Sequence, residues 1–173
     1  LNDESFKPVK RPSESIFTLD LPLISDLPEN HPARLYMDSR HLPAYPFQYS
    51  QEFYKFSSQF NAQLDESQKD FTADEARIVI PFFDNNGSVF AFQGISLAKH
   101  PTQKYITIIV NAKIPKIFGI DRVSFKRPVK IVEGPIDSLF LDNCLASVNA
   151  SLVSTAKKIS GVCKKSDITL IYD

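Results

Sequence analysis

The fold is decided by residues 128–173, which read PVKIVEGPIDSLFLDNCLASVNASLVSTAKKISGVCKKSDITLIYD. Three short apolar runs in this stretch are typical of buried strands, and two segments between them carry apolar residues at helical spacing. The predicted strands are 129–132, 145–148 and 168–172, and the predicted helices are 135–143 and 155–162. Strand, helix, strand, helix and strand in this order predict a parallel sheet with right-handed crossovers.

Acidic residues occupy the carboxyl ends of two of these predicted strands. Glu133 follows the first strand and Asp173 ends the third, so they lie side by side if the two strands are neighbours. Such a pair suits Mg²⁺, which takes oxygen ligands and completes its shell with waters and substrate phosphates. Gly134 is expected to permit the sharp strand-to-helix turn. Three other interpretations stay open at this point: a solvated loop carboxylate at Glu133, a helix-surface or capping acid at Asp137, and a frayed chain end at Asp173.

The segment upstream of this unit is predicted to form antiparallel strands. Residues 77–83, 88–92 and 104–110 are apolar and rich in β-branched and aromatic side chains. Asn86-Gly87 lies between the first two runs and predicts a two-residue hairpin turn, because both residues tolerate a positive φ. Pro81 indicates an edge position or a bulge, because proline has no N–H to donate to a neighbouring strand.

The first part of the chain is less regular. Residues 1–30 are rich in proline, serine and charge and predict an extended linker. Pro32 suits the first turn of a short helix, and Ser50 is a good N-cap for a second one. Residues 61–75 are polar and predict a loop.

Composition excludes several classes of protein. The chain is 43% hydrophobic and 23% charged, as in ordinary globular proteins, and it has no apolar run of the about 18 residues that a transmembrane helix needs. Cys144 and Cys163 form no C-x-x-C pair, so we expect no zinc ribbon, no disulfide framework and a reducing cytoplasm. The start at Leu1 lacks the features of a signal peptide, and we expect the chain to be cut from a longer one.

Positive charge is concentrated in one segment. Residues 99–130 contain eight basic residues against the single acidic residue Asp121, a net charge of +7 in a chain of net charge zero. Such a block is typical of a phosphate-binding surface, although a solvated face is about equally common. Apolar residues are interleaved with the charges, which favours a structured, functional surface. The basic residues are Lys99, Lys104, Lys113, Lys116, Arg122, Lys126, Arg127 and Lys130.

Several motifs now resemble a known family. Val132–Asp137 and Ile171–Asp173 resemble the Toprim signature, in which Glu-Gly-x-x-Asp is followed by an Asp-x-Asp strand end. Primases, topoisomerases, recombination factors and some nucleases share that signature. The upstream motifs resemble the basic subdomain of bacterial and phage DNA primases. These motifs are Ala33–Arg40, Arg77–Asp84, Gly87, Phe92–Gly94, Pro101–Tyr105 and Lys116–Ile120.

The resemblance implies a fold and a domain arrangement. It covers residues 31–173 in the correct order and implies an α+β N-terminal subdomain with antiparallel strands, followed by a truncated α/β Toprim-like parallel sheet. The implied segments are a linker over 1–30, the basic N-terminal subdomain of a primase core over 31–127, and a partial Toprim domain over 128–173.

The resemblance also implies a nucleotidyltransferase that makes short RNA primers on single-stranded DNA. Glu133 would act as general base or assist a Mg²⁺ or Mn²⁺ site, Asp173 would be a metal ligand, and Asp137 would support the same cluster. The groups holding template backbone or triphosphate would be Arg77, Lys104, Lys113, Lys116, Arg122, Lys126 and Arg127. The implied partners are the single-stranded DNA template, ribonucleoside triphosphates and a replicative helicase, with no membrane, in the cytoplasm of a bacterial or phage-infected cell.

The sequence departs from the family pattern in three places. Ile95 stands where the family has an arginine, the second aspartate of Asp-x-Asp would lie beyond Asp173, and the cysteine-rich zinc module is absent. These departures predict an internal fragment of a phage-like primase that is catalytically inactive by itself. Two alternatives stay open: another Toprim enzyme, such as a nuclease or topoisomerase, and a non-catalytic single-strand-binding module with aromatic side chains exposed on a groove.

Overall fold

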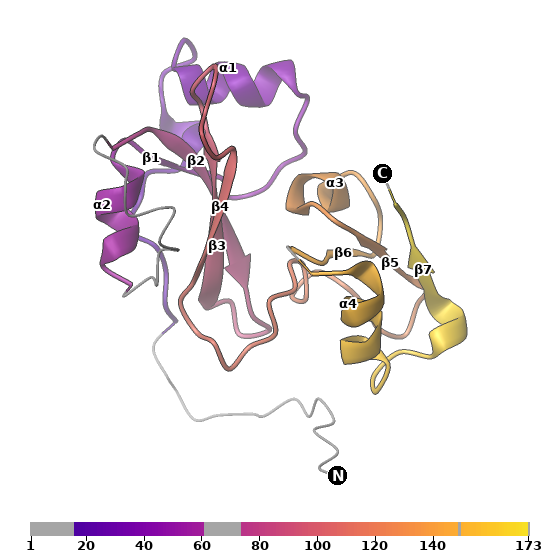
Figure 1. The fold of residues 1–173 in the computed structure, drawn as a ribbon. Helices are drawn as coiled ribbons and strands as arrows, with labels where there is room; N and C mark the ends of the chain where they lie inside the picture. Colours follow the sequence, from indigo (N-terminus) through magenta and orange to yellow (C-terminus); the bar gives the residue numbers. More distant parts are fainter. Residues whose placement is uncertain (1–15, 61–73, 149, 173) are drawn as a thin grey trace. The chain divides into compact units, whose positions relative to one another are not determined.

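The computed structural model describes residues 16–60, 74–148 and 150–172 (Figure 1). The chain divides into two compact units, which we describe separately. The antiparallel unit comprises Thr18–Phe82 and Val89–Ile114. Of the described residues, the parallel unit comprises 16–17, Phe83–Ser88, 115–148 and 150–172. Within the described residues, no helix is long and apolar enough to cross a membrane.

The antiparallel unit is built on a four-stranded sheet in the order β1-β2-β3-β4 (Figure 1). Its central strands, β2 and β3, are buried along almost their whole length because both faces are covered. The strands are β1 (Gln48–Ser50), β2 (Arg77–Phe83), β3 (Val89–Ser96) and β4 (Tyr105–Ile109), and the helices are η1 (Ile24–Asp26), α1 (Pro32–Ser39) and α2 (Phe53–Ser58). The predicted antiparallel strands are therefore confirmed.

Aromatic side chains attach α2 to this sheet. The Phe92 ring of β3 lies 6.1 Å from the Phe53 ring, 5.6 Å from the Phe56 ring and 5.3 Å from the Phe60 ring, measured between centroids. Edge-on and tilted contacts at these distances add to the stabilisation that burial itself provides.

Pro81 lies where the sheet leaves β2 unpaired on one side. β1 pairs with β2 only from Arg77 to Val79, so nothing in β1 requires an N–H at Pro81. Its carbonyl accepts a hydrogen bond from the Tyr45 hydroxyl. β2 is therefore not an edge strand as predicted; Pro81 is tolerated in this central strand because it lies beyond the short pairing with β1.

The turn between β2 and β3 differs from the predicted two-residue turn. Three residues separate Asp84 from Ser88, whose carbonyl accepts from the Asp84 N–H at 2.9 Å, and of these only Gly87 has a positive φ, 82°. The Asp84 carboxylate accepts from the N–H groups of Asn86 and Ser88 at 2.8 and 3.0 Å. The prediction was wrong because an aspartate that bonds the following backbone stabilises a longer turn with glycine at its last position.

Part of the predicted linker belongs to the antiparallel unit. Leu19 and Ile24 are buried, and Leu23 forms an antiparallel bridge with Gln48 of β1. Residues 1–15 and 61–73, which fall in the predicted linker and loop, lie outside the described residues. An extended linker therefore does not describe residues 18–30, because their apolar side chains cover the edge of the sheet.

The caps of the helices differ in how well the sequence predicted them. α1 begins at Pro32 as predicted, and the His31 side chain accepts from the Ala33 N–H. α2 begins at Phe53 rather than at a Ser50 cap, because the Asp74 carboxylate accepts from the N–H groups of Tyr54 and Lys55 at 2.8 and 2.9 Å. This cap comes from a residue 20 positions away along the chain.

The parallel unit contains the predicted alternation of strands and helices. Its sheet has the order β6-β5-β7, and β5 is parallel to both neighbours (Figure 1). The elements are β5 (Val129–Val132), α3 (Pro135–Leu139), β6 (Cys144–Ala146), α4 (Leu152–Ile159), η3 (Lys165–Asp167) and β7 (Ile168–Leu170). The predicted fold class is confirmed, although α3 is shorter than predicted and α4 begins earlier, at its Ser151 cap.

Residues 115–127 also belong to this unit, whereas the motifs placed the boundary at 127/128. Phe118 forms an antiparallel bridge with Ala146, which extends the sheet beyond β6. The Asn143 side chain donates to the carbonyls of Ser124 and Pro128 at 3.0 and 2.8 Å and accepts from the Ser124 N–H at 2.7 Å. These bonds hold the segment before β5 to the parallel sheet.

Candidate active site

The candidate site lies at the carboxyl end of the parallel sheet. Glu133 is the first residue after the central strand β5, and its side chain is exposed. β5 and β7 are neighbours in the register Ile131 to Leu170, and the Ile171 N–H donates to the Ile131 carbonyl at 2.9 Å. The first and third strands are therefore neighbours, which is the condition under which Glu133 and Asp173 would lie side by side. Asp173 itself lies outside the described residues.

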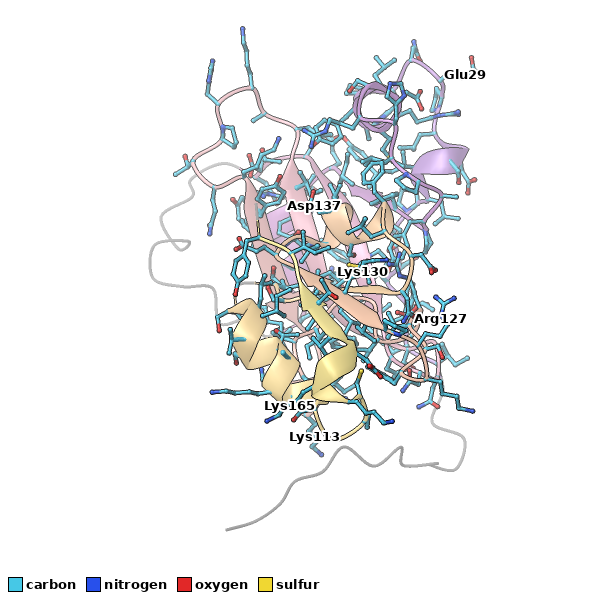
Figure 2. The ribbon with its side chains drawn as sticks, turned by 90° about the vertical axis from the view of Figure 1, so that its right-hand side faces the viewer. Glu29, Lys113, Arg127, Lys130, Asp137 and Lys165 are labelled. Carbon is cyan, nitrogen blue, oxygen red and sulfur yellow. The ribbon has the colours of Figure 1, made fainter. Side chains whose placement is uncertain are left out.

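Asp137 belongs to the same turn as Glu133. A Cβ atom placed on Gly134 would collide with the Asp137 carboxylate, so this carboxylate lies directly over the turn. Asp137 projects from α3 toward one end of the parallel unit, whereas Arg127 lies toward the other end (Figure 2). Gly134 has an ordinary φ of −99°, so the turn does not need the left-handed conformation that only glycine adopts readily; a side chain there would instead displace the Asp137 carboxylate.

A strained residue after β6 borders the same end of the sheet, and the motifs gave no sign of it. Val148 has a φ of 44°, which is rare for a β-branched residue, and its N–H donates to the Glu133 carbonyl at 3.2 Å. The preceding N–H, of Ser147, donates to the Val132 carbonyl at 2.9 Å. The Ser147 hydroxyl is buried and makes no hydrogen bond within the described structure. Two consecutive backbone bonds thus fix the turn that presents Glu133.

The donor set at this edge fits a hard divalent cation in part. Glu133 and Asp137 supply carboxylate oxygens at one turn, and Mg²⁺ binds through one or two carboxylates together with waters and phosphates. Among the described residues, no group of three or more histidine, cysteine, aspartate or glutamate side chains forms a cluster that could hold a metal ion.

Arg77 does not lie where the sequence placed it. The side chain is 0% exposed and lies inside the antiparallel unit. Its guanidinium group donates to three backbone carbonyls, to the Tyr54 hydroxyl and to the Glu75 carboxylate. This burial contradicts the predicted direct contact of Arg77 with template or triphosphate, because the charged group is already surrounded by protein acceptors.

Lys104 lies at the surface of the antiparallel unit. Its Nζ donates to the Ser96 carbonyl at 2.9 Å and lies 5.3 Å from the centroid of the Tyr36 ring. Burial, and then the charges of Arg40 and Arg77, lower the pKa of the Lys104 amine. An ammonium group crowded by other cations is a suitable place for a phosphate, which relieves the repulsion.

The other predicted basic residues fall into two groups. Lys113 is exposed and belongs to the antiparallel unit. In the parallel unit Lys126 is exposed, Arg127 pairs with Asp142 at 2.8 Å, and Lys116 is half-buried, which lowers the pKa of its amine. Arg122 donates to the carbonyls of Ser138 and Cys144 at 3.3 and 3.5 Å. The net +7 segment is therefore divided between the two units.

Ile95, at the position of the family's arginine, is fully buried in β3 opposite Tyr105 of β4. The side chain packs in the core and offers no group to a phosphate.

Comparison with known proteins gives a consistent set of relatives. A DNA primase of Enterobacteria phage T4 is 32% identical over 155 residues, which cover 84% of this chain and 45% of that protein. The chain thus spans less than half the length of this curated relative. No family model matches the chain.

Solved structures show the same fold. The Aquifex aeolicus primase, comprising zinc-binding and RNA polymerase domains, matches with a TM-score of 0.63 and 21% identity over 84% of this chain and 43% of that one. A DnaG primase catalytic domain bound to single-stranded DNA matches with a TM-score of 0.56 and 17% identity over 85% of this chain and 56% of that one.

Proposed function

Because this chain is related to the bacterial and phage-type DNA primases and has the fold of their core, we propose that it belongs to a primase that makes short RNA primers on single-stranded DNA. The carrying observation is the 32% identity to the phage T4 DNA primase over 84% of this chain. A match of that length includes residues of both the antiparallel and the parallel unit. The identity to a primase therefore supports a primase function over the two alternatives, which are a nuclease and a non-catalytic binding module.

In this reaction a 3′-hydroxyl attacks the α-phosphate of a ribonucleoside triphosphate, the bond between the α- and β-phosphates breaks, and pyrophosphate leaves, while negative charge accumulates on the phosphates. A bound Mg²⁺ or Mn²⁺ would neutralise that charge. Glu133 and Asp137 are the described residues that would hold the ion, with Asp173 as a further proposed ligand. Glu133 lies at the end of the central strand, where its carboxylate can also accept the proton of the attacking hydroxyl.

The basic residues would bind phosphates of template and triphosphate. Among the described residues, the Lys104 ammonium group donates to the Ser96 carbonyl, which engages one of its three N–H groups and leaves donors for a ligand. Lys113, Lys116, Arg122, Lys126 and Arg127 would contact backbone phosphates. Such contacts weaken with salt and carry no sequence information. A primase would act with a replicative helicase in the cytoplasm of a bacterial or phage-infected cell.

Primer synthesis by the complete protein tests the proposal. We expect Glu133→Gln to abolish incorporation of ribonucleotides on a single-stranded template, and to leave the melting temperature and the affinity for single-stranded DNA nearly unchanged. Asp167→Asn is the control, because Asp167 is an acid that directly precedes β7 at the opposite end of the same sheet and has no proposed role in binding. Full activity of Glu133→Gln would exclude the assigned site, and no synthesis by the wild-type protein would exclude the function.

A further inference from the structure

The buried Arg77 is the centre of a hydrogen-bond network in the antiparallel unit. Arginine is almost never fully buried unless its charge is paired, and here the partner is the Glu75 carboxylate. The Nη1 atom donates to the carbonyls of Gly94 and Lys104 at 3.1 and 3.2 Å. The Nη2 atom donates to the Gln103 carbonyl at 2.8 Å and to the Tyr54 hydroxyl at 3.3 Å.

These acceptors connect β3 to the end of the segment that joins it to β4. Gly94 lies in β3, whereas Gln103 and Lys104 are the last two residues before β4. One guanidinium group therefore fixes the backbone on both sides of a connection that contains no helix or strand. The Ser96 N–H adds a bond to the Lys104 carbonyl at 3.0 Å.

Gly94 and two aromatic rings surround the Arg77 side chain and leave space for it. A Cβ atom on Gly94 would overlap the Phe53 ring and lie 2.9 Å from the Arg77 Cδ atom, so only glycine leaves room. The guanidinium carbon lies 5.3 Å from the centroid of the Phe53 ring and 5.7 Å from that of Tyr54. Cation–π contacts of this kind contribute more when the cation is desolvated.

The same network reaches the side chain of Lys104. The Glu75 carboxylate, which pairs with Arg77, accepts from the Ser96 hydroxyl at 3.1 Å. The Ser96 carbonyl in turn accepts from Lys104 Nζ at 2.9 Å. Both the backbone and the ammonium group of Lys104 are therefore tied, directly or through two residues, to Arg77.

We propose that Arg77 is a positioning residue that holds the Lys104 ammonium group above Tyr36 for phosphate binding. The inference rests on the proposed function only in that Lys104 binds a phosphate of template or nucleotide. Because Glu75 neutralises the Arg77 charge, Arg77 does not itself bind the ligand. It fixes the position of Lys104, and the Lys104 ammonium group provides the positive charge that binds the phosphate. The motif arginine and the motif glycine Gly94 then serve one purpose, which is the placement of a lysine 27 residues downstream of Arg77.

A double-mutant cycle tests the proposal, with the dissociation constant of ATP measured by direct titration of the complete protein in the presence of Mg²⁺. We expect Lys104→Ala and Arg77→Lys each to weaken ATP binding about tenfold, since Arg77→Lys keeps the charge and loses the planar fork that reaches several acceptors. Since Arg77 acts through Lys104, the double variant should bind ATP no more weakly than Lys104→Ala alone.

A further tenfold loss in the double variant would overturn the proposal. If Arg77 had only a general structural role, the loss of ATP affinity caused by Arg77→Lys would add to the loss caused by Lys104→Ala. Tyr54→Phe removes one acceptor of Arg77 and provides a milder variant where Arg77→Lys does not fold. We expect it to weaken ATP binding about twofold in the wild-type background and not at all in Lys104→Ala. The titration is independent of primer synthesis, so a protein that shows this coupling and makes no primers would support the positioning role and exclude the proposed function.

Discussion

Val148 is the residue whose backbone is least expected from its chemistry. It has a φ of 44° and is buried, and β-branched side chains avoid this region. Such conformations cost of the order of 1–3 kcal/mol and persist only where the surroundings enforce them. Here the enforced conformation directs the Val148 N–H at the carbonyl of Glu133, so the strain lies next to the proposed catalytic carboxylate.

Replacement of Val148 by glycine measures that strain. Val129 of β5 is the matched control, since it is an equally buried valine in ordinary strand conformation. Both substitutions remove the same side chain, but only Val148→Gly relieves the backbone. We expect Val148→Gly to lower the free energy of unfolding in urea by about 1–3 kcal/mol less than Val129→Gly does. Equal losses would show that Val148 carries no strain.

Cys144 gives a second prediction at this scale. Burial raises the pKa of its thiol to about 11, and burial also raises the pKa of the Cys163 thiol. The thiolate is the reactive form, so at pH 8 only about one Cys144 thiol in a thousand is ionised. We expect neither cysteine to react with a disulfide reagent within an hour at pH 8, and both to react within minutes in urea. Rapid modification of the native protein would contradict the burial.

The motif residues show what sequence can and cannot assign to a single position. The motifs identified Arg77, Gly134 and Glu133. The structure places Glu133 and Gly134 directly after the central strand of the parallel sheet, but it buries Arg77 inside the antiparallel unit, away from the phosphate contact predicted for it. The role of Arg77 could not be predicted, because three of its acceptors are backbone carbonyls that only the folded chain brings together. The reason for Gly134 was equally hidden, because it depends on where the Asp137 carboxylate lies.

At the scale of an element, the β2–β3 turn gives the clearest test. Gly87 has a φ of 82° with open space around it, so a substitution there is strained without any collision. We expect Gly87→Ala to lower the free energy of unfolding by about 1 kcal/mol. Gly161→Ala is the matched control, because Gly161 also has open space and lacks a positive φ, and we expect it to be neutral or slightly stabilising. The same urea titration measures both variants.

Element types were predictable from the sequence, whereas their ends were not. Periodicity identified the strands β2 to β7 and the helices α1, α3 and α4, because local burial patterns determine them. The start of α2 depends on Asp74, which lies beyond residues 61–73 in the sequence, and no local pattern indicates such a cap. The predicted strand 145–148 ends in the structure at Ala146, because Val148 adopts a positive φ. The pattern of apolar residues does not indicate that turn.

At the scale of the whole molecule, the distribution of charge decides how nucleic acid binds. The net +7 of residues 99–130 was read from the sequence as one surface, but the structure assigns these residues to two units. Some of these cations already have protein partners, which compete with a phosphate: Arg127 contacts Asp142, and Arg122 donates to two carbonyls. A chain of zero net charge cannot attract DNA through its total charge, so local groups must account for any affinity.

The last prediction separates local from total charge. A quadruple variant with Lys113, Lys116, Lys126 and Arg127 replaced by alanine removes four positive charges from the 99–130 segment. Its control replaces Lys157, Lys158, Lys164 and Lys165, four exposed lysines of the parallel unit, and changes the net charge equally. Each phosphate contact on single-stranded DNA contributes about 0.7 to the slope of log affinity against log salt. We therefore expect the first variant to flatten the slope by up to about 3 and the control to leave it nearly unchanged. Equal flattening in both variants would mean that the DNA responds to total charge, and the assignment of the 99–130 segment as the binding surface would then be wrong.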